Sequence, residues 1–544
     1  IFTDNTNGDL TWQTAYNAML KVWDEALQDG LSTPKVSFML PFMDTTYTNM
    51  QMSAIYQDLY RPGNYQNHWY YLDGKPMIMA RADSFDAAKS PLEKEISRFF
   101  TFRAGTPMFD TENPGYNTWG WLSVYPQIKH YTSAKDEARG IVEQITVGTA
   151  VNYSYTQKLM AAMSGDNVTG RSYTSAYPDR YAKEGAEATK WGYNFAEQWN
   201  YALEVDPKVV FITGWNEFRV DRNKVWPEGW DTETPNAFPD QYNAENSRDI
   251  EPSRGVLGDA YYYQFVNYVR QYKGVRAIPE AGAKTTLDVS ASPSQWQSVT
   301  PYYAAYIGNT GDRDARGYGE LTYRDYSGRN DIIGAQMARD DENIYILVEC
   351  AEDISPYTDP LWMNIYLDID GREGGWESFN YVINKTTPKS ESVAVLERFT
   401  GNGYESEAVA AIKYSVQGRY LQAEIPKSAL GIESDDFTVN FSVTDNVHDE
   451  DDQTESDNKD YVYSRFSGNI LDFYTSGDVA PGGRFKFSYM SHEEDIPLPE
   501  HDSLPEVEEE MNCSGCGSFT AAPLAAIIPA ALAIGKKRKK TDKE

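Results

Sequence analysis

The sequence predicts a (β/α)₈ TIM-type barrel that is cut short on its N-terminal side, then an antiparallel β-sandwich, then a C-terminal membrane or sorting tail. Three observations predict this order. Short apolar runs alternate with amphipathic stretches over residues 1–275, the apolar periodicity changes to two from residue 296, and an apolar run followed by basic residues lies near the end. With 544 residues, the chain is long enough for two or three folded units.

The barrel is predicted from the alternation of short strands and longer helices, which is typical of parallel βαβ units. The chain opens on a run that is similar to the end of a buried strand, so we expect part of the barrel to precede it. A doubly wound sheet is the alternative, but no glycine fingerprint follows a strand. The predicted strands are Ile1–Asp4, Lys35–Leu40, Pro76–Ala82, Phe99–Arg103, Ile145–Val151 and Val209–Trp215, and the predicted helices include Trp12–Gln28, Met50–Tyr60 and Tyr193–Leu203.

The second half follows a predicted linker over residues 276–295. Between residues 296 and 489, apolar and polar residues alternate with turn residues between the runs, which predicts a β-sandwich. The clearest strands are Asn343–Glu349, Trp362–Asp368, Tyr420–Ile425 and Phe437–Val443.

The C-terminal end combines an acidic spacer, residues 490–518, with an apolar tail that has a basic end, residues 519–544. The apolar run 519–535 just reaches the roughly 17–25 residues that a membrane-spanning helix needs, and the basic cluster after it fits the positive-inside rule. The tail resembles the sorting tails of bacterial surface proteins, although no Leu-Pro-x-Thr-Gly signal is present. We therefore expect an extracellular protein that is tethered to the membrane or cell envelope.

The composition favours a glycan as partner and argues against nucleic acid. Aromatic residues make up 14% of the chain, with 40 Tyr and 13 Trp, and aromatic rings stack on the apolar faces of sugars. A net charge of −32 does not suit phosphate backbones. Three cysteines and five scattered histidines form neither a disulfide framework nor a metal-ligand pattern.

Reactive groups of a (β/α) barrel lie at the C-terminal ends of its strands. Asp4, Asp44, Arg103 and Glu217 each end or follow a predicted strand, so several carboxylates should face one mouth. Glycoside hydrolysis needs two such carboxyl groups. Salt bridges or loop caps are the competing explanation for each carboxylate.

Glu217 has neighbours that suit a sugar site. Trp215 can form a platform for a sugar ring, and Asn216 can donate to a sugar hydroxyl. Arg219 can lower the pKa of a nearby carboxylate.

Four short motifs carry a resemblance to glycoside hydrolase family 99 and its relatives in family 71-like barrels: Phe2–Asn7, Gly74–Met79, Phe211–Phe218 and Ile250–Pro252. The resemblance implies hydrolysis of an α-linked, mannan-like glycan, with Glu217 in the catalytic pair.

The chain departs from the family at the second catalytic Glu, because Val220 stands in that position. The partner of Glu217 must then be Asp221, Glu251 or Asp4, unless the barrel is not catalytic. Asp221 is the nearest by position, and Asp4 is the better candidate by strand-end geometry.

The segment 119–127 is predicted to be a loop at the same mouth. Trp119, Trp121, Tyr125 and Gln127 are its candidate substrate-lining residues, and a packed aromatic loop is the alternative.

The sandwich region resembles carbohydrate-binding module family 9 and the related DOMON-like domains. Trp296, the strand entry Asp340–Ile346, the run Leu367–Gly371, Trp376 and Tyr381 carry this resemblance. It implies sugar binding with a structural calcium ion near Asp368 and Asp370. No other cofactor is expected.

Together these patterns predict a cell-surface glycoside hydrolase that acts on an α-linked polysaccharide or glycan by carboxylate acid/base catalysis. The alternative is a non-catalytic surface protein that binds glycan. A structural surface-layer component without glycan affinity is a third hypothesis.

Overall fold

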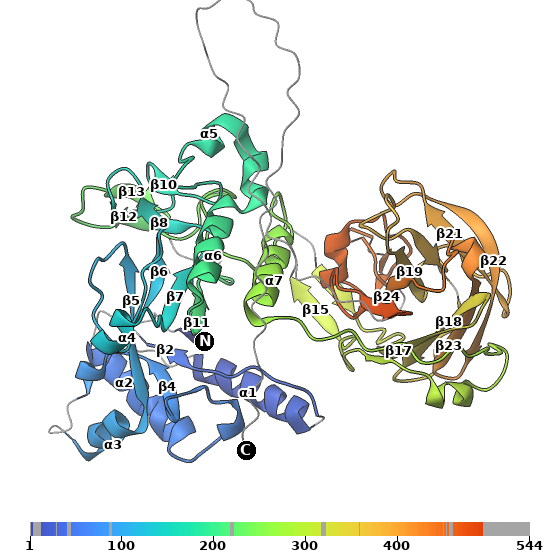
Figure 1. Cartoon of the computed structure of the whole chain (residues 1–544), viewed down its shortest axis with the longest axis horizontal. Helices are drawn as coiled ribbons and strands as arrows, with labels where there is room; N and C mark the ends of the chain where they lie inside the picture. Colours follow the sequence, from blue (N-terminus) through green and yellow to red (C-terminus); the bar gives the residue numbers. More distant parts are fainter. Residues whose placement is uncertain are drawn as a thin grey trace, which may run out of the picture. The chain divides into compact units, whose positions relative to one another are not determined.

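The N-terminal half is a parallel α/β region whose strands lie side by side in the order of the sequence (Figure 1). The computed structural model describes residues 2–3, 12–28, 30–40, 45–85, 90–217, 222–316, 322–357, 359–449, 451–452, 454–455 and 461–492. One curled sheet has the order β1-β2-β4-β5-β6, and β7 pairs in parallel with β11. The bounds of these strands are β1 Phe2–Thr3, β2 Phe38–Met39, β4 Lys75–Met79, β5 Thr101–Phe109, β6 Thr118–Ser123, β7 Gln144–Val147 and β11 Val209–Ile212.

This order confirms a parallel α/β region but not a complete barrel. In the part of the chain that the structure describes, β6 and β7 belong to different sheets, and no closed ring of eight strands forms. The strand order does not reverse within either parallel sheet, which is what a doubly wound sheet would require.

The two faces of the curled sheet carry different apolar side chains, because neighbouring strand residues point to opposite faces. Ile78 packs with Leu20 and Met52 of the outer helices. Met77 and Met79 pack on the inner side with Trp119. The helices are α1 Trp12–Gln28, α2 Thr45–Ile55 with the π-helical turn η1 Tyr56–Tyr60, α3 Pro91–Phe99, α4 Ala134–Ala138, α5 Arg180–Glu184, α6 Tyr193–Val205 and α7 Ala260–Lys273.

Strand β6 corrects the expectation of a loop at residues 119–127. Trp119 and Trp121 lie within this strand, and Trp119 is buried between the methionines of β2 and β4. Gly105 of β5 makes room there, since a Cβ atom at this position would lie 2.9 Å from the Cε atom of Met79. Trp119 thus fills the interior, while residues 124–127 follow the end of the strand.

The C-terminal half is one large antiparallel sheet that curls around its own apolar core (Figure 1). The strand order is β14-β17-β18-β23-β22-β21-β20-β19-β24-β27, and β28 pairs with β24. The predicted antiparallel strands are therefore present, but in a single curled sheet rather than in two separate ones. Their bounds are β14 Tyr302–Ala304, β17 Ile332–Arg339, β18 Asn343–Cys350, β19 Asn364–Ile369, β20 Tyr381–Ile383, β21 Val393–Phe399, β22 Ser406–Gln417, β23 Tyr420–Pro426, β24 Thr438–Asp445, β27 Asp478–Ala480 and β28 Phe487–Met490.

Part of the predicted linker packs against this antiparallel sheet. Leu287, Val289 and Trp296 are buried with Tyr345 and Leu347 of β18. The short elements that remain are β3 Tyr71–Leu72, β8 Val151–Ser154, β9 Leu159–Met160, β10 Val168–Thr169, β12 Asn223–Trp226, β13 Thr234–Ala237, β15 Arg313–Arg316, β16 Thr322–Asp325, β25 Thr454–Glu455 and β26 Tyr461–Val462.

Within the described ranges, no helix has both the length and the apolar character that a membrane crossing requires. The predicted tail, residues 519–544, and all of the spacer beyond residue 492 lie outside those ranges.

Candidate functional site

The C-terminal ends of β7 and β11 meet a segment that comes much later in the chain. The carbonyl oxygen of Trp215 accepts hydrogen bonds from the backbone N–H groups of Ile250 (3.1 Å) and Glu251 (2.9 Å). Thr149 Oγ1 donates to the carbonyl oxygen of Arg248 at 2.7 Å. These bonds fix residues 248–251 against the strand ends, where a barrel enzyme carries its reactive groups.

Gly214 makes this close approach possible. Its φ of +79° lies in the left-handed region, and a Cβ atom here would clash with the carbonyl oxygen of Arg248 and lie only 3.0 Å from its carbonyl carbon. Only glycine accepts both constraints without strain. The residue that follows, Trp215, therefore enters the site beside residues 248–251.

Arg248 is the centre of a cluster of carboxylates. Its guanidinium is 3% exposed, and Nη2 lies 2.7 Å from Oδ1 of Asp240 and 3.3 Å from Oε2 of Glu217. Asn152 also donates to Oδ1 of Asp240 at 2.6 Å. The ring of Trp121 lies 5.6 Å from the guanidinium carbon, at cation–π range.

Asp249 completes the cluster by holding the backbone at Glu217. Its Oδ1 accepts the N–H of Glu217 at 2.6 Å, and its other oxygen accepts from the side-chain amide of Gln241. The buried Arg171 donates to the carbonyl oxygen of Asp249 at 2.6 Å. Both carboxylate oxygens of Asp249 are thus occupied by the protein itself.

The electrostatics favour a proton on this cluster. Burial raises the pKa of Glu217, the carboxylates of Asp240 and Asp249 raise it further, and Arg248 opposes them. Burial also raises the pKa of Asp249, against the hydrogen bond from Glu217 and the charge of Arg248. Both carboxyl groups are therefore easier to protonate than in water, although Arg248 acts against both shifts and Arg171 also acts against that of Asp249.

Glu217 and its two predecessors face solvent. The side chain of Glu217 is 44% exposed, and Trp215 is equally exposed. The Trp215 ring is held edge-on by Tyr262 and Phe265 of α7, with ring centroids 5.9 and 6.0 Å away. A fixed, exposed aromatic ring beside an acid is a surface on which a sugar ring can stack.

Two other predicted site residues, Trp121 and Glu251, are connected with Glu217. The ring of Trp121 lies against Arg248, which binds Glu217, and the backbone N–H of Glu251 donates to the carbonyl oxygen of Trp215. Four others, Asp4, Asp44, Arg219 and Asp221, lie outside the described residues.

Arg103 is the third residue of β5 and lies beside Met79, the last residue of β4. It binds Glu143 at 2.8 Å, and both side chains are buried. Within the described residues, no hydrogen bond or ion pair joins Arg103 to Glu217 or Arg248. Its role in substrate binding stays a prediction.

Tyr125 and Gln127 lie on the segment that follows β6. Tyr125 is 37% exposed and packs edge-on against Tyr201 of α6 at 5.8 Å. Gln127 is buried, and its amide has no hydrogen-bond partner in the part of the chain that the structure describes. Neither residue contacts Glu217 or Arg248 through a hydrogen bond or an ion pair.

Sequence reasoning missed Asp240, Arg248 and Asp249. The one local signal was the run Arg248–Glu251, in which three charged residues precede Pro252 beside an apolar isoleucine. Charged side chains that are buried need oppositely charged or hydrogen-bonding partners from other parts of the chain, so such a run indicates a polar site.

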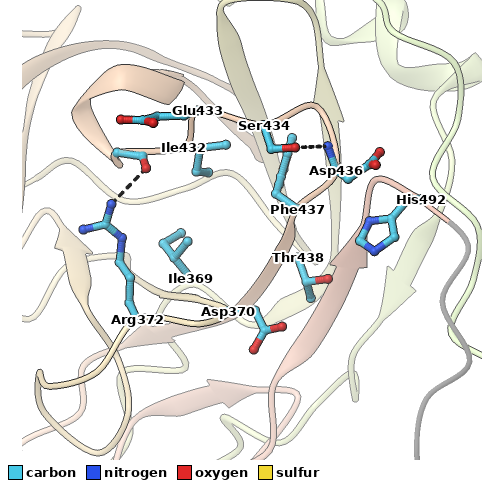
Figure 2. A pocket seen from close by; sticks show the side chains of 11 residues that line it. Ile369, Asp370, Arg372, Ile432, Glu433, Ser434, Asp436, Phe437, Thr438 and His492 are labelled. Atoms are coloured by element: carbon cyan, nitrogen blue, oxygen red, sulfur yellow. Dashed lines mark hydrogen bonds between the residues drawn. The ribbon is translucent and has the colours of Figure 1, made fainter.

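The antiparallel half offers less chemistry. Asp368 binds Lys486 at 2.6 Å and Asn440 at 3.4 Å, and Asp370 lines a shallow cavity of about 400 Å³ with Arg372, Glu433 and Asp436 (Figure 2). Figure 2 shows Arg372 turned to the backbone carbonyl of Gly431, which it binds at 3.0 Å. In the ranges described, no three His, Cys, Asp or Glu side chains gather as metal ligands.

No protein-family model, curated protein or solved structure matches this chain. The residues of the site are therefore the basis for proposing a function.

Proposed function

We propose that this chain is a cell-surface glycoside hydrolase that acts on an α-linked polysaccharide or glycan, with Glu217 as the proton donor. The observation that carries the proposal is the environment of Glu217. Its side chain is half-exposed, burial and the charge of Asp240 raise its pKa, and the fixed ring of Trp215 lies beside it. A carboxyl group that stays protonated can protonate the leaving oxygen of a glycosidic bond. The cell-surface location depends on the sequence of residues 519–544.

The net charge of the chain also bears on the substrate. The whole chain carries a net charge of −32, so anionic glycans would be repelled and neutral sugars would be favoured.

Hydrolysis of α-mannan, α-glucan and 4-nitrophenyl α-glycosides by the full chain tests the proposal. Glu217→Gln keeps the shape of the side chain and removes the acid, and it should lower hydrolysis by about 10²–10⁴-fold while glycan binding remains. Glu204→Gln, an exposed glutamate on α6, is the matched control and should leave hydrolysis unchanged.

Hydrolysis that survives Glu217→Gln would remove the role given to Glu217. Glycan binding without any hydrolysis by the natural sequence would favour the non-catalytic binding protein, for which Trp215 alone would suffice.

A further inference from the structure

Arg248 connects Glu217 with one particular carboxylate, that of Asp240. Nη2 of Arg248 is 3.3 Å from Oε2 of Glu217 and 2.7 Å from Oδ1 of Asp240, so these two oxygens are at most about 6 Å apart. Carboxyl groups about 5–5.5 Å apart are spaced for a retaining glycosidase, and groups about 6.5–9.5 Å apart for an inverting one. This limit applies to Oε2 and Oδ1, and it allows the spacing of about 5–5.5 Å that a retaining pair needs.

Asp240 keeps one oxygen available for chemistry. Arg248 and Asn152 both bind Oδ1, and no donor among the described residues binds Oδ2. The side chain is 18% exposed, so it is held firmly and still reached from outside. A nucleophilic carboxylate needs this combination of a fixed position and a free lone pair.

The neighbouring carboxylates do not meet both conditions. Asp249 is 4% exposed, and its two oxygens already bind the Glu217 N–H and the Gln241 amide. Glu251 is linked to the site through its backbone, and within the described ranges no hydrogen bond or ion pair joins its carboxylate to Glu217 or Arg248. Asp249 is therefore a positioning residue.

Arg248 itself has unused donors at this point. It is almost wholly buried, and its Nε and Nη1 atoms have no hydrogen-bond partner among the residues that the structure describes. Buried donors normally find acceptors. Because these two atoms are enclosed by protein, a sugar does not reach them, and the part that Arg248 plays is to hold Glu217 and Asp240 at their spacing.

We propose that Asp240 is the nucleophile of a retaining mechanism in which Glu217 is the acid/base. In the first step Glu217 gives its proton to the glycosidic oxygen, the bond between that oxygen and C1 breaks with its electron pair on the oxygen, and Oδ2 of Asp240 forms an ester bond to C1. In the second step water attacks C1, Glu217 takes a proton from the water, and the electron pair of the ester bond returns to Asp240. Two inversions at C1 give net retention.

This inference rests on the proposed function, and its test separates the two. In the first measurement, the natural sequence hydrolyses its substrate and NMR identifies the anomer of the sugar that is formed first. In the second, the same protein is treated with a fluorinated glycosyl fluoride of that sugar and then digested, and mass spectrometry locates the labelled peptide. We expect the retained anomer and a glycosyl label on Asp240. Neither measurement depends on the folding of a variant.

Variants give a second measurement. Asp240→Asn should lower hydrolysis by about 10⁴-fold or more, and azide should rescue Asp240→Ala with a glycosyl azide of inverted configuration. Azide should rescue Glu217→Ala with retained configuration. Asp231→Asn, at an exposed position between β12 and β13, is the matched control and should stay active.

Three results would overturn the role of Asp240: an inverted first product, a label on another residue, or near-normal hydrolysis by Asp240→Asn. The proposed function would still stand in these cases if Glu217→Gln lowers hydrolysis. If the natural sequence hydrolyses none of the substrates, or if Glu217→Gln leaves hydrolysis unchanged, the proposed function and this inference are both overturned.

Discussion

Replacing Gly214 with alanine should damage the fold at the point where the site is assembled. Gly214 has a φ of +79°, and an added Cβ would clash with the carbonyl oxygen of Arg248. An alanine in the left-handed region costs about 1–2 kcal/mol. The clash adds an overpacking cost of about 1–3 kcal/mol, and moving the carbonyl breaks its 2.7 Å hydrogen bond with Thr149, a loss of about 1 kcal/mol.

We therefore expect Gly214→Ala to lower the free energy of unfolding by about 3–6 kcal/mol in urea titrations followed by tryptophan fluorescence. Gly229 is the matched control, because its φ is +78° and no atom lies within 4 Å of an added Cβ. Gly229→Ala should show only the conformational cost of about 1–2 kcal/mol. Equal losses for the two variants would refute the close approach of residues 214 and 248.

Three further predictions concern charged groups. Because burial and Asp240 raise the pKa of Glu217, hydrolysis should decline only above the ordinary range of a glutamate, and an alkaline limb of the kcat/KM profile at pH 4–5 would contradict this. Burial raises the pKa of Asp478 to about 7 from 3.8. The stability that its proton contributes is therefore fully present below about pH 4, and about 4 kcal/mol of it is lost as the pH rises through 7. Urea titrations across this pH range should show the loss, and Asp478→Asn should make the stability less dependent on pH. Arg103→Met should lower stability by about 3–5 kcal/mol, because it leaves the buried carboxylate of Glu143 unpaired, and it should leave KM unchanged; a raised KM at normal stability would instead support the predicted role of Arg103 in substrate binding.

Local patterns predict the elements whose burial is uniform along a short run. The runs of β4 and β11 are largely apolar on both faces, and β7 is buried along its whole length, with Gln144 and Thr146 on one face and Ile145 and Val147 on the other. The position of Glu217 directly after β11 follows from that pattern. The helices α1 and α6 begin at the predicted residues, Trp12 and Tyr193, because their apolar spacing is regular.

Tertiary contacts decide what the local patterns leave open. The sequence predicts a loop from Trp119 because the segment is long and follows a predicted strand end, yet Trp119 packs with the inner methionines and residues 118–123 form β6. Asp240 reaches Asn152 across 88 residues, and Arg248 reaches Glu217 across 31. No periodicity in the sequence records such pairs, so the carboxylate cluster could not be predicted beyond Glu217.

The hydrogen bond between Thr149 and the carbonyl of Arg248 spans 99 residues of chain. Closing a loop of this length has a large entropic cost, and it is offset only when the strands between the two residues have packed. The segment that carries Arg248 is therefore expected to reach its place only after the strands between these residues have packed. The carboxylate cluster that Arg248 organises thus reports on the packing of the whole stretch from residue 149 to residue 248.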